Sequence, residues 1–279
     1  MERAADYLKK CLKINSKYAA GMIAMGNLLF ESGHAKTAAK YFQQSLVYNP
    51  KEIQALIGLA NALYDMGEPK EAVQYYKRAI EIDDGISDVY YNLANALYLL
   101  KSVDEAIENY KKALELNPKK VECFYNLGNS YCNKNDYSQA IQFYLNAIAL
   151  DPLHDPAFYN LGYAYHRTGQ LEQAIHSYKL AIKLNHTSSE CHFNLASAYS
   201  DHGDVDSAIA EYKESLLHDP ENVDCIFHIA QIQEEHGQPA DAYAYYKKAL
   251  GINTTSNRAS DGVRRLKKIM DDKGIKYNE

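Results

Sequence analysis

Apolar and small residues recur in this chain at helical spacing. In the segment 155–188 the first such set follows the i, i+3, i+4, i+7 spacing of one helix face: Phe158, Leu161, Gly162 and Tyr165. A second set of the same kind follows a polar turn that contains Gly169: Ala174, Tyr178 and Ala181. Glycine at the turn suits a helix end in the left-handed conformation. The segment therefore predicts two helices joined by a short turn.

The same pattern returns every 34 residues. Seven complete segments fit without an insertion: 19–52, 53–86, 87–120, 121–154, 155–188, 189–222 and 223–256. Alanine occupies position 20 of all seven, and position 24 is always Phe or Tyr. Small residues at positions 8 and 20 let two helices approach closely, and the ring fills the space beside them. We expect seven antiparallel helix pairs, each of which buries its apolar face only by stacking on the next.

The two ends of the chain differ from the repeat. Residues 1–18 match only the second helix of a segment, with Ala4, Leu8 and Cys11 at positions 20, 24 and 27. Either the chain is a piece of a longer array, or this helix docks on a partner or a second copy. Residues 257–279 break the phase and carry an apolar face opposite a basic one, which predicts a cap helix. A membrane-surface role for the basic face is the alternative.

This 34-residue period, with its small and aromatic columns, resembles the tetratricopeptide repeat (TPR) family over residues 19–256. The resemblance implies an all-α fold, a right-handed α–α superhelix (TPR solenoid) of antiparallel helix pairs. Residues 1–18 then form an incomplete repeat, each 34-residue segment is one TPR unit, and 257–279 form the C-terminal cap helix. The resemblance also implies that the first helices of the pairs line a concave groove.

Composition and charge exclude several classes of function. The net charge of −6 disfavours a nucleic-acid or anionic-membrane binder, and no apolar run reaches the 18 residues of a membrane span. Three of the five cysteines share repeat position 3 and form no CxxC, so we expect buried fillers rather than a disulfide or zinc set: Cys123, Cys191 and Cys225. A reducing, intracellular setting follows; we expect a cytoplasmic protein, with nuclear or ciliary locations left open.

No catalytic constellation is present in the sequence. It has no GxSxG, no Walker loop and no HExxH, and its ten histidines lack metal-ligand spacing. We therefore expect no enzymatic activity, no cofactor and no metal site.

If the chain follows the family, positions 2, 5, 6, 9, 12 and 13 of the first helices face the groove, and three of these columns carry the candidate site. Position 5 is aromatic from the third segment on: Tyr91, Tyr125, Tyr159, Phe193 and Phe227. Position 6 carries Asn92, Asn126, Asn160 and Asn194, and position 9 carries Asn61, Asn95 and Asn129. An Asn amide pairs with a backbone N–H and C=O together, so these residues predict a site for an extended peptide. The alternative is that they are the average residues of ordinary TPR units and serve packing and solubility.

The charges of the groove columns indicate the kind of partner. Position 5 lacks the basic residues of the carboxylate clamp found in chaperone-binding TPR proteins, and the groove edge is mostly acidic, as at Asp65 and Glu122. Lys134 and Arg167 are exceptions. We predict a non-enzymatic interaction module that holds a neutral to basic peptide or partner helix in the groove.

Two alternatives to this function remain open. The asparagine columns are similar to those in the TPR superhelix of O-linked N-acetylglucosamine transferases, so the chain could be the repeat arm of a larger glycosyltransferase-like enzyme. It could instead be an architectural subunit that self-associates through residues 1–18.

Overall fold

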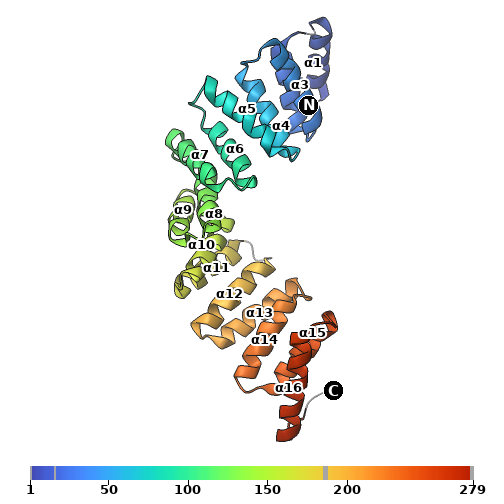
Figure 1. The fold of residues 1–279 in the computed structure, drawn as a ribbon, viewed down its shortest axis with the longest axis vertical. Coiled ribbons are helices and arrows are strands. Elements are labelled where there is room, and N and C mark those ends of the chain that lie inside the picture. Colours follow the sequence, from blue (N-terminus) through green and yellow to red (C-terminus); the bar gives the residue numbers. More distant parts are fainter. Residues whose placement is uncertain (1, 16, 185–187, 277–279) are drawn as a thin grey trace. The chain divides into compact units, whose positions relative to one another are not determined.

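The computed structural model describes residues 2–15, 17–184 and 188–276, and side chains from residue 6 onward. Within these ranges the chain forms sixteen α-helices and no β-strand (Figure 1). The helices are α1 (Glu2–Ile14), α2 (Ala19–Glu31), α3 (Ala35–Tyr48), α4 (Ile53–Asp65), α5 (Pro69–Ile82), α6 (Ser87–Leu99), α7 (Val103–Leu116), α8 (Val121–Asn133), α9 (Tyr137–Leu150), α10 (Asp155–Arg167), α11 (Leu171–Leu184), α12 (Ser189–His202), α13 (Val205–His218), α14 (Val223–Glu235), α15 (Pro239–Ile252) and α16 (Asn257–Lys273). The predicted all-α fold is confirmed. None of the described helices combines the length and apolar character that crossing a membrane requires.

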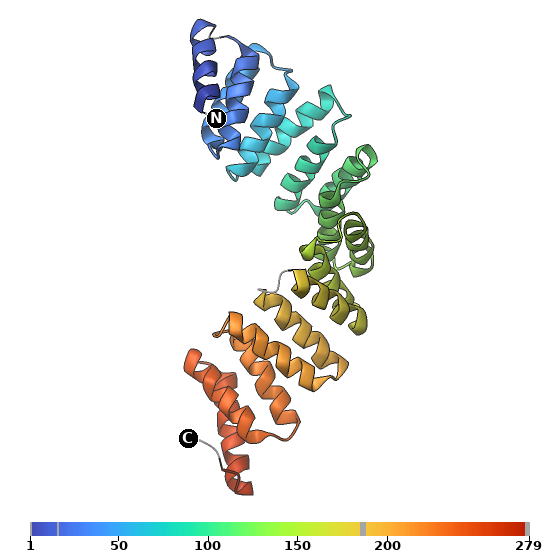
Figure 2. The same ribbon diagram turned by 180° about the vertical axis from the view of Figure 1, so that it is seen from behind.

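The chain divides into two compact units, Met1–Asp136 and Tyr137–Glu279, called unit 1 and unit 2 below. In unit 1, α2 packs on α3, α4 on α5 and α6 on α7, and each second helix also contacts the first helix of the next pair. Unit 2 repeats this arrangement from α10 to α15, and α16 packs on α15 (Figure 2). Each helix pair is therefore covered by its neighbours within the unit, as the repeat pattern predicts.

The aromatic ring at repeat position 24 fills the space between the two helices of each pair. Tyr110 and Tyr178 expose no more than 1% of their surface, and position 20 beside them is fully buried alanine. A Cβ atom added to Gly162, at position 8, would lie 2.7 Å from the Tyr178 ring. The small columns thus have a steric cause, since the aromatic ring occupies the room that a larger side chain would need.

The turns between paired helices adopt the left-handed backbone conformation. Five of these turns place a glycine there with φ between 70° and 89°: Gly33, Gly67, Gly169, Gly203 and Gly237. Lys101 and Asn135 hold the same place with φ of 64° and 60°. A Cβ atom is disfavoured in this conformation, and lysine has no short polar side chain to compensate. The backbone at Lys101 is therefore strained.

Replacing Lys101 by glycine is expected to raise the free energy of unfolding by about 1 kcal/mol, because glycine adopts a positive φ without steric cost. The measurement is the shift of the urea midpoint followed by circular dichroism. Lys101→Ala is the matched control, since it removes the charge and keeps the Cβ atom. Equal stabilisation by both substitutions would contradict the backbone explanation.

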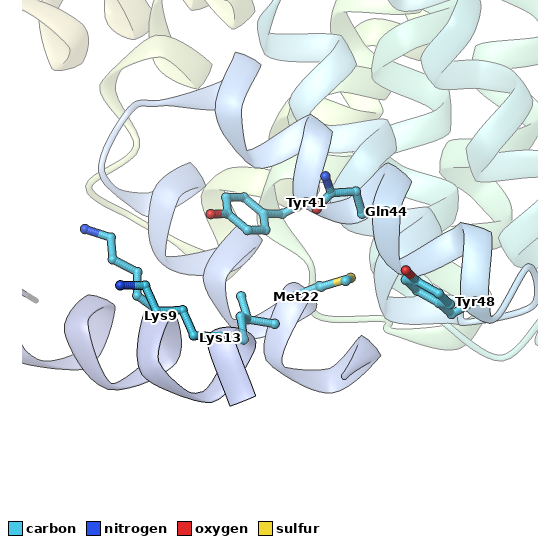
Figure 3. A pocket seen from close by; sticks show the side chains of 7 residues that line it. Lys9, Lys13, Met22, Tyr41, Gln44 and Tyr48 are labelled. Carbon is cyan, nitrogen blue, oxygen red and sulfur yellow. The ribbon is translucent and has the colours of Figure 1, made fainter. Parts of the chain in front are cut away.

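The first helix, α1, leaves an apolar face exposed. Tyr7 and Ile14 expose 69% and 88% of their surface, Cys11 is also exposed, and Leu8 is half-buried. The side chain of Ala4, the third residue predicted on this face, lies outside the described part. A cavity of about 470 Å³ lies where α1, α2 and α3 meet. Figure 3 shows the side chains that line it: Lys9, Leu12, Lys13, Met22, Tyr41, Gln44 and Tyr48.

The last helix, α16, takes the place of a further first helix. It begins at Asn257, which is position 1 of the next 34-residue period, and Ser256 caps it by accepting from the Ala259 N–H. Ala259, Leu266 and Met270 are buried against the end of unit 2. The sequence pattern changes after residue 256, but the start of the helix keeps the register of the repeat.

Candidate functional site

Four asparagines of unit 1 form two pairs between consecutive first helices. The Asn92 side chain on α6 donates from Nδ2 to Oδ1 of Asn61 on α4, at 3.1 Å. The Asn126 side chain on α8 donates in the same way to Oδ1 of Asn95 on α6, also at 3.1 Å. The structure thus brings position 6 of one repeat to position 9 of the preceding repeat. We call these the amide pairs.

Each amide pair is anchored to a buried tyrosine at position 24. The Tyr76 hydroxyl donates to Asn61 Oδ1 at 2.6 Å, and the Tyr110 hydroxyl donates to Asn95 Oδ1 at 2.5 Å. Burial raises the pKa of both tyrosines well above the usual value, so the hydroxyls stay protonated as donors. The position 9 oxygen therefore has two partners, which fixes the orientation of the amide.

The remaining polar atoms of the amide pairs are available. Among the described residues, no hydrogen bond reaches Nδ2 of Asn61 or Asn95, or Oδ1 of Asn92 or Asn126. Each pair thus presents one donor and one acceptor, the complement of the C=O and N–H of a peptide backbone. The sequence suggested that a single Asn would supply both groups. In the structure the two groups come from two residues, because the position 6 Nδ2 and the position 9 Oδ1 are hydrogen-bonded to each other.

A cavity opens beside the first amide pair. Its volume is about 210 Å³, and it is lined by Phe30, Asn61, Tyr64, Asp65, Tyr76, Asn92 and Asn95. Burial raises the pKa of Tyr64. Phe30 and Tyr64 occupy repeat position 12, which the family resemblance places on the groove, but neither is among the predicted site residues. The signal was present in the sequence, since position 12 is aromatic in the first three segments: Phe30, Tyr64 and Tyr98.

Tyr91 does not offer a free ring face, contrary to the expectation that the position 5 aromatics form the groove floor. The Lys120 ammonium lies 4.7 Å from the ring centroid and 2.9 Å from Oδ1 of Asp88. The Tyr91 ring packs at 6.0 Å from Tyr110. Because the ring already has a cation on it, Tyr91 contributes to packing within unit 1. The other two predicted residues of α8, Tyr125 and Asn129, are half-buried.

The asparagine pattern changes in unit 2. Asn194 on α12 donates from Nδ2 to the Tyr159 hydroxyl on α10, at 2.7 Å. It has no position 9 asparagine to pair with, because that place is Tyr163. The Tyr163 hydroxyl accepts instead from Arg167 at 2.8 Å. The predicted site residue Asn160 lies half-buried on α10.

One consequence of this change is an unsatisfied hydroxyl. The Tyr178 side chain is fully buried, and its hydroxyl has no partner among the described residues. In unit 1 the equivalent hydroxyls of Tyr76 and Tyr110 donate to a position 9 asparagine. A buried hydroxyl without a partner is destabilising, so the fifth repeat lacks a contact that the second and third have.

The predicted aromatic residues Phe193 and Phe227 of unit 2 also pack against other side chains, with Phe193 half-buried and Phe227 buried. Phe193 packs at 5.6 Å from Tyr212 and at 5.7 Å from His228, and burial lowers the pKa of His228, which favours the neutral ring. The Arg258 guanidinium on α16 lies 4.8 Å from the Phe227 ring centroid. The ring face of Phe227 is therefore not a free floor of the groove.

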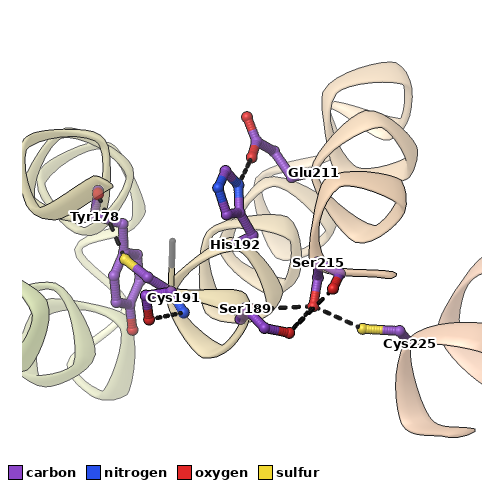
Figure 4. A network of polar contacts seen from close by, with 8 residues as sticks. Tyr178, Ser189, Cys191, His192, Glu211, Ser215 and Cys225 are labelled. Atoms are coloured by element: carbon purple, nitrogen blue, oxygen red, sulfur yellow. Dashed lines mark hydrogen bonds and ion pairs between the residues drawn. The ribbon is translucent and has the colours of Figure 1, made fainter. Parts of the chain in front are cut away.

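The buried cysteines take part in helix packing. Cys191 Sγ lies 3.6 Å from the Tyr178 carbonyl oxygen, and Cys225 Sγ lies 3.3 Å from Ser215 Oγ (Figure 4). Burial raises the pKa of the Cys123 and Cys191 thiols to about 12, so they are not thiolates at neutral pH. Their prediction as buried fillers is confirmed. Within the described ranges, no three His, Cys, Asp or Glu side chains converge as metal ligands.

Profiles of known families match most of the chain. Those described as "Tetratricopeptide repeat" match residues 23–85, 87–120, 109–142, 156–188 and 193–257, and one described as "TPR repeat" matches 128–169. None of the curated proteins matches the sequence at a significant level.

Solved structures show the same fold. The C-terminal part of a TPR repeat-containing protein from Cytophaga hutchinsonii superposes with a TM-score of 0.77 at 17% identity, over 86% of this chain and 99% of that one. YrrB, described as a TPR protein with an unusual peptide-binding site, gives 0.62 at 23% identity, over 69% and 99%. The Cut9–Hcn1 hetero-tetramer of the APC/C gives 0.59 at 18% identity, over 94% of this chain and 52% of the other.

Proposed function

Because the chain belongs to the tetratricopeptide repeat family, we propose that it is a non-enzymatic binding scaffold that holds an extended peptide along the first helices of unit 1. The observation that carries this proposal is the geometry of the amide pairs. Each pair leaves one donor and one acceptor available, and the position 9 amides are held in place by Tyr76 and Tyr110. A peptide bound in this way is held mainly through its backbone, with little demand on its side chains.

The charges beside the amide pairs favour a neutral to basic peptide. Glu31, Asp65 and Glu122 are exposed on the first helices of unit 1. Two lysines next to these helices are already paired, Lys120 with Asp88 and Lys134 with Asp104. Their positive charge is thus largely offset, and the remaining field attracts a basic segment.

We also place the scaffold in a reducing compartment such as the cytoplasm. None of the five cysteines forms a disulfide in the described part of the chain, and Cys123, Cys191 and Cys225 are buried where they pack as small apolar residues. Proteins in oxidising compartments more often use cysteines as disulfides.

The experiment that tests the proposed function uses peptides selected from a displayed random library on the full chain. Replacing both Asn92 and Asn126 by alanine removes the two available acceptors and keeps the bonds from Tyr76 and Tyr110 to Asn61 and Asn95. We expect the double variant to bind the selected peptides about tenfold more weakly in a fluorescence anisotropy titration, since two hydrogen bonds are lost.

Asn109→Ala is the matched control, because the Asn109 amide bonds only the Glu105 carbonyl of its own helix, α7. It should leave the affinity unchanged. Undiminished binding by the Asn92→Ala, Asn126→Ala variant would show that the peptide is held elsewhere.

A further inference from the structure

We propose that the cavity beside the first amide pair binds the cationic side chain of a lysine or arginine in the peptide. This inference rests on the proposed function, because the amide pair beside the cavity holds the backbone from which that side chain extends. It adds a requirement that the amide pairs alone do not impose, namely a basic residue at one position of the peptide.

The walls of the cavity combine aromatic rings with one carboxylate. Phe30 on α2, Tyr64 on α4 and Tyr76 on α5 supply the rings, and Asp65 on α4 supplies the charge. Among the residues that the structure describes, no lysine, arginine or histidine lines the cavity. Aromatic faces attract a cation through their quadrupole, and a carboxylate attracts it more strongly and accepts its hydrogen bonds. The lining therefore favours a cation over an apolar or acidic group.

The size of the cavity suits one long side chain. Its volume of about 210 Å³ lies below the roughly 300–1,000 Å³ of sites for drug-sized ligands. Lysine and arginine have apolar stems that pack along rings while the charged end reaches a polar group. Phe30 and Tyr64 are half-buried, so their exposed parts are available to the stem, and Asp65 is exposed at the end of α4.

The carboxylate of Asp65 is available for an external partner. Within the described ranges it forms no hydrogen bond and no ion pair. By contrast, Asp88 on the next first helix is bound by Lys120. Asp65 is thus the acidic group at this cavity that a bound peptide can neutralise.

Among the cations that the described residues hold against aromatic rings, two illustrate this kind of contact. The Lys120 ammonium lies between the Tyr91 ring, at 4.7 Å, and the Asp88 carboxylate, at 2.9 Å. The Arg258 guanidinium lies 4.8 Å from the Phe227 ring and donates to Gln231 Oε1 at 2.8 Å. In both places a first-helix aromatic residue and a side-chain oxygen bind a basic residue from the same chain. At the Asp65 cavity the ring and the oxygen are present, and the peptide supplies the cation.

The site is specific to one place in unit 1. The residues that correspond to Tyr64 and Asp65 are Tyr98 and Leu99 in the third segment, and Cys132 and Asn133 in the fourth. Neither of these pairs contains a carboxylate. The first segment does carry Phe30 and Glu31 at these positions, but position 6 of the next repeat is Gly58, so no amide pair lies beside them. One basic residue, rather than a repeated basic pattern, is therefore expected in the peptide.

The test uses the peptides selected on the full chain and their variants. We expect the selected sequences to share a lysine or arginine at one position. Replacing that residue by norleucine, which keeps the stem and removes the charge, should lower the affinity about tenfold. With the Asp65→Asn protein the parent peptide and the norleucine peptide should bind equally. Asp65 is exposed and unpaired, so this variant is expected to fold like the wild type.

Glu81→Gln is the matched control, since Glu81 is an exposed acid on α5 that does not line the cavity. It should preserve the tenfold difference between the two peptides. A preference for the basic peptide that persists in Asp65→Asn, or selected peptides without a shared basic residue, would overturn the cavity assignment and leave the amide-pair function standing. If the Asn92→Ala, Asn126→Ala variant binds as well as the wild type, the proposed function itself fails and the assignment fails with it.

Discussion

Replacing Tyr110 by alanine is expected to lower the free energy of unfolding by about 3–5 kcal/mol. The Tyr110 ring exposes only 1% of its surface, where it fills the space between paired helices beside Ala106 and Ala113. Its loss leaves a cavity, and it also removes the hydroxyl that anchors Asn95. The measurement is the urea unfolding curve of the full chain followed by circular dichroism.

Two phenylalanine substitutions separate the ring from the hydroxyl. Tyr110→Phe should lower the free energy of unfolding by about 1 kcal/mol, because it removes the hydrogen bond to Asn95 and keeps the ring. Tyr178→Phe should be neutral or stabilising, because the Tyr178 hydroxyl is buried without a partner among the described residues. Equal losses in the two variants would contradict the anchoring of the amide pairs to the core.

Replacing Leu266 by aspartate is expected to lower the free energy of unfolding by about 3 kcal/mol or more and to detach α16 from the rest of unit 2. Leu266 exposes 1% of its surface within the apolar cluster that includes Ile226, Tyr243 and Tyr246. An unpaired carboxylate cannot stay in that cluster, so the helix leaves and exposes the residues it covered. Faster hydrogen exchange of the backbone amides in α14 and α15 would report the detachment.

Lys268→Asp is the control for the effect of charge on α16. Lys268 is exposed on the same helix and is not a member of the apolar cluster. It should change stability by less than about 0.5 kcal/mol. If Leu266→Asp and Lys268→Asp change the free energy of unfolding equally, apolar contact with α14 and α15 is not what keeps α16 docked.

Much of the fold could be predicted from the sequence because it depends on short-range rules. The period of small and aromatic residues specifies which helix faces meet, since each face is set by spacing along one helix. The glycine column predicted a left-handed turn, and Lys101 adopts the same positive φ without a glycine. The backbone at this turn is therefore imposed by the stacked helices rather than by the residue that occupies it.

The candidate site was harder to predict because its contacts join side chains of different repeats. The sequence predicts the asparagine columns. It does not predict that Oδ1 of a position 9 asparagine accepts one hydrogen bond from a core tyrosine and another from the position 6 asparagine of the next repeat. The coverage of Tyr91 by Lys120 and of Phe227 by Arg258 was also missed. Lys120 lies at position 34, outside the columns that the family resemblance assigns to the groove, and Arg258 lies on the cap helix. Their reach depends on rotamers that a column of residue types does not specify.

The central claim is that the amide pairs bind the backbone of a peptide. The most direct test is an N-methylation scan of a selected peptide, with affinities measured for the wild type and for the Asn92→Ala, Asn126→Ala protein. N-methylation removes a backbone donor and leaves the side chains in place. The account predicts that methylation at one or two peptide bonds weakens binding to the wild type about tenfold and has little effect with the double variant. Tolerance of methylation at every bond, or an equal loss with both proteins, would contradict it.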